Sequence, residues 1–125
     1  MTPDDFRALA LGLDGAIERA HMGHPDFRAN GRIFATLHAD DEWGMVKLAP
    51  EEQKEFIRSY QGTFVPSSGA WGRQGCTNVR LATVDTATLR TALLLACEKT
   101  LKAPSRRQKR PSGRSGRRLK RSAQG

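Results

Sequence analysis

Two histidines and an aspartate lie close together in the sequence, at a spacing that could hold a metal ion. His21 and His24 are separated by two residues, and Asp26 follows His24 after one proline. Imidazole, carboxylate and thiolate groups are the usual zinc ligands, so Cys76 could complete a site if the fold brought it near. Because this spacing is loose and no second ligand pair accompanies it, we expect the histidines to form hydrogen bonds at a strand edge or turn. A His–Asp–Cys metal site is the alternative.

The segment GAWGRQG, residues 69–75, combines three glycines with Trp71 and Arg73. It matches neither the phosphate-binding loop nor the dinucleotide-binding fingerprint. Nucleophilic catalysis by Cys76 or by the serines at 67–68 would need a neighbouring base, and no nucleophile-elbow pattern surrounds them. We therefore expect a non-enzymatic protein in which the glycines form turns and Trp71 packs onto the sheet. An exposed Trp71 beside Arg73 would instead stack on a base or bind a phosphate.

The C-terminal segment, residues 104–125, holds nine of the 21 lysines and arginines and none of the 13 acidic residues. Residues 1–103 therefore carry 12 basic and 13 acidic groups, a net charge of −1, although the whole chain carries +8. The segment is nearly devoid of apolar residues, so we expect it to be disordered. Clustered Lys and Arg bind polyanions by releasing counterions, and a tail that only improves solubility is the alternative. The tail residues predicted to contact nucleic acid are Arg106, Arg107, Lys109, Arg110, Arg117, Arg118, Lys120 and Arg121.

Three helices are predicted to position these groups. The first begins at Pro3, with Thr2 as its N-cap, and ends near Gly15. The second begins at Pro50 and ends at Gly62. The third covers residues 86–102 after Asp85 as N-cap. Its predicted apolar face consists of Leu89, Ala92, Leu93, Ala96, Cys97 and Leu101.

Strands are predicted between the helices. Residues 16–32 favour short extended pieces joined by turns, and residues 32–49 alternate as a β-hairpin. Residues 63–84 predict two strands, the second ending at Val84, joined by a long glycine-bearing loop. The order helix, strands, helix, strands, helix favours an α+β fold with an antiparallel sheet flanked by helices on one side. Phe34 and Trp43 lie on opposite faces of the hairpin, and whichever face of the sheet is uncovered is the candidate binding surface.

Three segments together resemble the MmcQ/YjbR family of small bacterial proteins: GHPDFRANGRIFATL, VKLAPEEQ and SSGAWGRQGCTNVRLATVDTATLRTALLLA. The resemblance covers about residues 3–103 and leaves the tail outside. It implies a fold similar to CyaY/frataxin and to type III secretion chaperones, which agrees with the predicted order of elements. Members are commonly labelled DNA-binding by analogy to a double-wing arrangement, so the resemblance implies DNA as a partner. One departure is Ala49, where the family often has Ser or Thr, and it deprives the second helix of a side-chain cap.

Two functions remain open from the sequence. In the first, the protein is a DNA-binding or DNA-associated protein whose tail supplies nonspecific affinity. The sheet residues predicted to contact DNA are Arg28, Arg32, Trp71, Arg73 and Arg80. In the second, a groove beside Trp71 binds a peptide or small molecule, which an exposed apolar patch without a basic rim would favour.

The chain is also expected to be cytoplasmic, without a membrane partner or a cofactor. No apolar run approaches the ~20 residues of a membrane-spanning helix, and the N-terminus lacks the pattern of a signal peptide. The two cysteines are too few to indicate a disulfide scaffold, which favours a reducing compartment.

Overall fold

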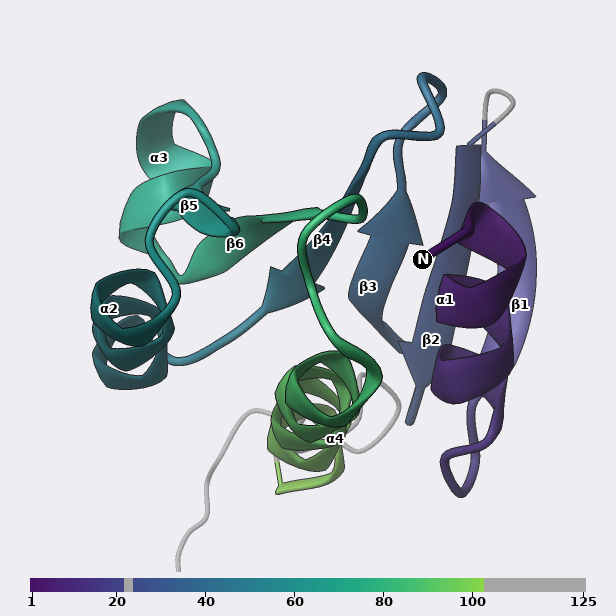
Figure 1. Cartoon of the computed structure of the whole chain (residues 1–125). Helices are drawn as coiled ribbons and strands as arrows, with labels where there is room; N and C mark the ends of the chain where they lie inside the picture. Colours follow the sequence, from purple (N-terminus) through teal and green to yellow (C-terminus); the bar gives the residue numbers. More distant parts are fainter. Residues whose placement is uncertain (22–23, 103–125) are drawn as a thin grey trace, which may run out of the picture.

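The structure, a computed structural model, describes residues 1–21 and 24–102. In this part of the chain, a six-stranded antiparallel sheet has the strand order β1-β2-β3-β4-β6-β5 (Figure 1). The strands are β1 (Ile17–His21), β2 (His24–Ala29), β3 (Arg32–Leu37), β4 (Trp43–Lys47), β5 (Phe64–Pro66) and β6 (Cys76–Arg80). The helices are α1 (Pro3–Leu11), α2 (Pro50–Ser59), α3 (Gly69–Arg73) and α4 (Thr86–Lys102). The predicted α+β class, with an antiparallel sheet flanked by helices, is therefore confirmed. The prediction of a disordered, nucleic-acid-binding segment at 104–125 lies outside the described residues.

The helices begin where their capping residues predict. Thr2 accepts a hydrogen bond from the Asp5 N–H and donates its own backbone N–H to the Asp5 carboxylate, forming a capping box at α1. At α2 the Ala49 side chain makes no cap bond, as predicted, and Glu52 accepts the Ala49 N–H at 3.0 Å instead. Two helices end earlier in the sequence than predicted. Helix α1 ends at Leu11 rather than near Gly15, and α2 ends at Ser59 rather than at Gly62.

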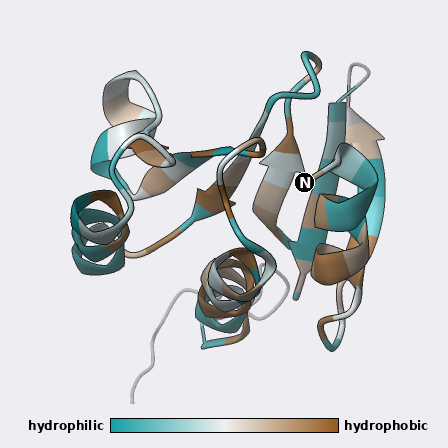
Figure 2. Ribbon diagram, viewed as in Figure 1, coloured by the Kyte–Doolittle hydropathy of each residue, from teal (hydrophilic) through white to brown (hydrophobic). Residues whose placement is uncertain are grey.

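The hydrophobic core lies on one face of the sheet, under α1 and α4. Phe6 of α1, Leu93 of α4 and Phe27 of β2 are each fully buried in it. Figure 1 shows α1 in front of β1 and β2, and α4 below β3 and β4, between α1 and α2. Figure 2 shows both hydrophobic and hydrophilic residues along α1, α2 and α4, as expected of helices with one buried face. The predicted apolar face of α4 is buried except at Leu101, which is exposed.

A β-bulge explains why two consecutive residues of β3 enter the core. The register between β2 and β3 shifts at Phe27 and Arg28. Phe34 and Ala35 are both completely buried as a result. Trp43, by contrast, is half-buried and lies outside the core cluster. The two aromatic rings of the hairpin therefore lie on different sides of the sheet, as predicted.

The segment between β5 and β6 departs from the prediction of an irregular loop. It folds into the short helix α3, which is followed directly by β6. β6 ends at Arg80, four residues before the predicted end, because Leu81 to Thr83 form a turn. This shift places Cys76 and Asn78, rather than the residues after Arg80, in the sheet. No helix among the described residues is long and apolar enough to cross a membrane.

The cap of α4 makes the stability of the fold depend on pH. The Asp85 carboxylate accepts hydrogen bonds from the Thr88 N–H at 2.7 Å and from the Thr88 hydroxyl at 3.0 Å. These bonds favour the charged form, first the backbone bond and then the side-chain bond, and hold the pKa of Asp85 below the ordinary value of 3.8. The stabilisation is therefore complete above the unfolded-state pKa and disappears as the pH falls through the folded-state pKa.

We expect Asp85→Asn to melt below the wild-type chain at neutral pH, because its amide does not carry the charge that strengthens the cap. The difference in melting temperature should shrink as the pH falls below 3.8, where the wild-type carboxyl becomes protonated. Thermal melts of the two chains across this range measure that difference directly. A gap that stays constant with pH would contradict a titrating cap.

Candidate functional site

The face of the sheet opposite α1 and α4 carries half-exposed and charged side chains. Along β4, buried Gly44 and Val46 alternate with half-buried Trp43, Met45 and Lys47. Directly paired residues of antiparallel strands project from the same face. Trp43 therefore shares this face with Arg80, and Met45 shares it with Asn78. We call this surface the open face.

Two adjoining hollows form a trough across the open face, and a third adjoins them at the end of the sheet, where α4 also lines it. The first hollow lies over β2 and β3 and has a volume of about 370 Å³. The second lies over β3, β4 and β6 and has a volume of about 380 Å³. The third lies at the end of the sheet beside Trp71 and has a volume of about 230 Å³. The first two share Ile33, Thr36 and His38, and the last two share Ile33, Lys47, Trp71 and Cys76. A ligand lying across the strands of the open face would therefore contact the first two.

Positive charge predominates on the open face. Arg19 of β1 lies opposite Asp26 of β2 in the strand register, so it projects from the open face. Arg80 lies over the Trp43 ring, with its guanidinium carbon 4.6 Å from the ring centroid. Lys47 projects from β4 into the trough. Many of the carboxylates lie elsewhere: on α1 at 4–5, on α2 at 51–55, and in Glu18, which bonds Arg7 of α1. The helices carry cations as well, among them Lys54, Arg90 and Lys102, so the open face differs from them in having few carboxylates rather than in holding the positive charge.

Asp26 is the carboxylate of the open face, and Arg28 compensates its charge. The carboxylate is 3% exposed and accepts two hydrogen bonds from Arg28, at 2.8 Å to Nε and 3.2 Å to Nη2. This bidentate bond raises the pKa of Arg28. Because its charge is already paired, Arg28 is less available to an anionic ligand than Lys47 or Arg80.

Trp71 is exposed, and the prediction that it packs onto the core was wrong. Its exposed fraction is 63%, and Lys47 Nζ lies 5.9 Å from its ring centroid. The position follows from the packing of α3, where Gly72 lies so close to the Ser67 carbonyl that a Cβ would meet the oxygen at 1.9 Å. Buried Gln53 also donates to the Gly72 carbonyl at 2.9 Å and to the Cys76 carbonyl at 3.0 Å. The backbone around Trp71 is fixed, while its side chain faces solvent.

The other residues predicted to contact DNA have different surroundings. Arg73 is exposed on α3, but residues two apart on a helix do not face each other, so it is not beside Trp71. Arg32 is half-buried at the sheet end, where Ala96 and Thr100 of α4 line the same hollow. Arg80 lies on the open face, opposite Trp43 in the strand register.

Two cations of the open face, Lys47 and Arg19, were not identified from the sequence. Lys47 lies four positions after Trp43 along the predicted strand, which is an even interval. The alternation of side chains could therefore have placed both on one face of the sheet. Arg19 could not be placed, because the residues around it show no clear alternation.

The residues proposed for metal binding or nucleophilic catalysis are not brought together. His24 and Asp26 line the hollow at β2, whereas Cys76 lines the two hollows near Trp71. Among the described residues, no group of three or more His, Cys, Asp or Glu could hold a metal ion. Burial raises the pKa of the Cys76 thiol, despite the opposing effect of Lys47 and Lys99. Cys76 is therefore a protonated thiol at neutral pH, which is a poor nucleophile and metal ligand.

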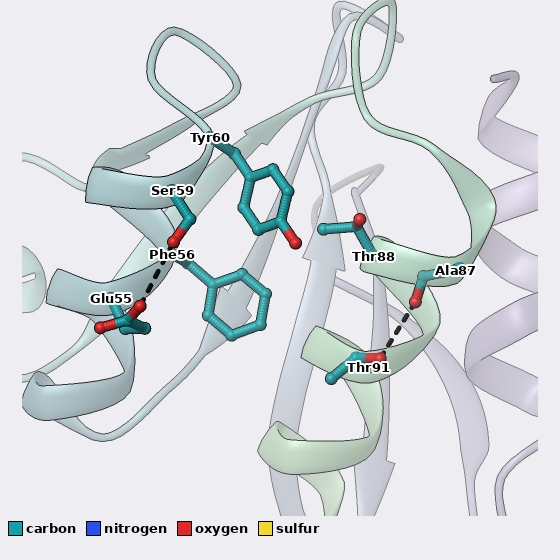
Figure 3. Close-up of a pocket in the computed structure, with 7 residues that line it drawn as sticks. All are labelled: Glu55, Phe56, Ser59, Tyr60, Ala87, Thr88 and Thr91. Atoms are coloured by element: carbon teal, nitrogen blue, oxygen red, sulfur yellow. Dashed lines mark hydrogen bonds between the residues drawn. The ribbon is translucent and has the colours of Figure 1, made fainter.

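A further hollow lies on the helix side, between α2 and α4 (Figure 3). Its volume is about 350 Å³. Phe56 and Tyr60 project into it from α2, and Thr88 and Thr91 line it from α4. Its charged residue is Glu55, so the hollow does not suit an anionic ligand.

Comparisons with known proteins agree with this architecture. The family model described as YjbR matches residues 11–96. A crystal structure of the Deinococcus radiodurans protein DR2400, with the domain DUF419, matches with a TM-score of 0.69. The two chains are 20% identical, and the match covers 81% of this chain and 79% of that chain. At this identity the likeness shows a shared fold. No curated protein matches this chain.

Proposed function

The chain belongs to the YjbR family, and from this premise we propose that it is a non-enzymatic DNA-binding protein whose open face contacts the phosphate backbone. The observation that carries the proposal is the scarcity of carboxylates among the cations of the open face. Arg19, Lys47 and Arg80 share the open face with one carboxylate, Asp26, which Arg28 already compensates, among the residues described on these strands. A basic face of this kind attracts a polyanion although residues 1–103 are nearly neutral overall.

The basic tail supplies additional affinity in this proposal. Its nine Lys and Arg residues lie within 22 residues of chain, which favours contact with any polyanion regardless of sequence. The open face then determines the orientation of the bound strand, because its cations lie at fixed positions on β-strands.

A peptide or small-molecule ligand is the alternative, and the surroundings of the trough favour it less. The trough has an apolar floor at Ile33 and Met45, but Arg19, Lys47 and Arg80 surround it. A peptide site would be favoured by an apolar patch without such a basic rim. The hollow between α2 and α4 lacks a basic rim but is lined largely by polar residues, and its Tyr60 provides a control for the experiments below.

The proposal is tested by removing three charges from one side of the sheet at a time. In the full chain we expect Arg19, Lys47 and Arg80, all changed to Gln, to weaken binding of a labelled duplex DNA by about tenfold or more at low salt. Removal of each phosphate-binding cation should also reduce the slope of log K against the logarithm of the salt concentration by about 0.9. The matched control changes Lys54, Arg90 and Lys102, which are exposed on α2 and α4, to Gln.

Fluorescence anisotropy across a salt series measures both quantities. The control variant has the same net charge as the open-face variant, so it should bind more tightly and retain more of the salt slope. Equal reductions of affinity in the two variants would contradict an oriented binding face. A third chain, with the nine tail cations changed to Gln, separates the contribution of the tail: if open-face changes have no effect in that background, the sheet is not the DNA surface.

A further inference from the structure

The trough ends at an exposed aromatic ring on a fixed support. Trp71 is 63% exposed, yet α3 beneath it is held by the close approach of Gly72 to Ser67 and by the two hydrogen bonds of Gln53. A large indole held in water on a backbone that cannot easily move provides a stacking platform at little cost in conformational entropy. This arrangement suits a ligand with a flat, apolar face.

The groups around Trp71 match the remaining parts of a nucleotide. Met45 and Ile33 form an apolar floor beside the ring, and Thr36 and Asn78 line the same hollow with hydrogen-bonding groups. The Asn78 amide is oriented by the Ser67 hydroxyl, which donates to its Oδ1 at 2.8 Å. Lys47, with its Nζ 5.9 Å from the ring centroid, brings a positive charge to the edge of the platform.

The β3–β4 turn argues for a single strand rather than a duplex groove. This turn projects beyond the sheet, and it carries exposed Asp40, Asp41 and Glu42 (Figure 1). Three carboxylates at the tip of a hairpin are repelled by the phosphates that line a groove. Unpaired bases, in contrast, offer their faces to an aromatic ring without having to leave a stack.

We propose that the trough binds single-stranded nucleic acid, with one base stacked on Trp71 and the adjacent phosphate held by Lys47. This inference rests on the proposed function and specifies its ligand. The trough crosses from β2 to β6, a distance of about 14 Å at about 4.8 Å between neighbouring strands. A short run of nucleotides therefore lies across the strands, and Arg80 contacts a further phosphate.

The test compares a labelled oligothymidine with a labelled duplex, using the full chain in which the nine tail cations are changed to Gln. We expect the single strand to bind more tightly than the duplex at equal salt. Trp71→Ala should weaken single-strand binding by about five- to a hundredfold, because it removes the aromatic ring on which a base stacks. Trp71→Phe keeps a stacking surface and should recover most of the affinity.

Tyr60→Ala is the matched control, because Tyr60 is also an exposed aromatic residue but lies on the helix side. It should leave binding of both probes unchanged. Unaltered affinity in Trp71→Ala, or tighter binding of the duplex than of the single strand, would overturn this inference. If the open-face charge variant still weakened duplex binding in that case, the proposed DNA-binding function would stand without the stacked base. Thermal melts of each variant show whether it is folded.

Discussion

Gly75→Ala is expected to lower the free energy of unfolding by about 3–5 kcal/mol, which is a large part of the stability of a small domain. Gly75 has a φ of +110°, where residues with a side chain are strained. A Cβ at this position would lie 1.8 Å from the Leu48 carbonyl oxygen. The backbone cannot easily move away, because the Leu48 N–H donates to the Gly75 carbonyl at 3.1 Å. Urea denaturation of both chains measures the change.

Gly62→Ala separates the two causes of this destabilisation. Gly62 has a φ of +85°, but a Cβ there would meet no atom within 4 Å. We expect this variant to show only the cost of the left-handed backbone, about 1–2 kcal/mol. Equal effects at the two glycines would mean that the clash with Leu48 relaxes without cost, and that backbone strain alone accounts for the effect of Gly75→Ala.

The overall fold could be predicted because local signals and hydrophobic patterns agree along most of the chain. Thr2 and Asp85 are side-chain caps that define helix starts, and alternation at 32–49 identifies the hairpin. The ends of elements were harder to place. Helix α1 ends before the glycine that was expected to terminate it, where the Gly12 N–H bonds the Ala8 and Ala10 carbonyls, and β6 ends where the turn at 81–83 begins.

The candidate site could be predicted only in part, because its residues come from separate strands. Arg80 and Trp71 were recognised as individual residues, but their relation to Lys47 depends on the register between β4 and β6. The exposure of Trp71 could not be predicted, because tryptophan is usually well buried and three glycines fit a loop as well as a helix. The decisive interaction is long-range: Gln53 of α2 fixes a helix that begins 16 residues later.

Gln53→Ala is therefore expected to affect both stability and the candidate site. Gln53 is 7% exposed, and its amide donates to the Gly72 and Cys76 carbonyls. Each carbonyl keeps a second donor, from the Gly75 N–H and the Ser67 N–H respectively, so neither is left entirely without a partner. Removing two buried hydrogen bonds and leaving a cavity should cost about 2–4 kcal/mol in the free energy of unfolding. Chemical denaturation measures this decrease.

Gln53→Met distinguishes the effect of the hydrogen bonds from that of the cavity, because methionine fills most of the same volume without an amide. If the two bonds hold α3 in place, both Gln53 variants should weaken single-strand binding, although residue 53 is buried and does not line the trough. Trp71 fluorescence, measured in a Trp43→Phe background, should then shift in both variants relative to the parent chain. If Gln53→Met kept full stability and an unchanged Trp71 spectrum, packing alone would hold α3. In that case the exposed ring would owe its position to Gly72 and Gly75, whose close contacts with Ser67 and Leu48 are independent of the amide.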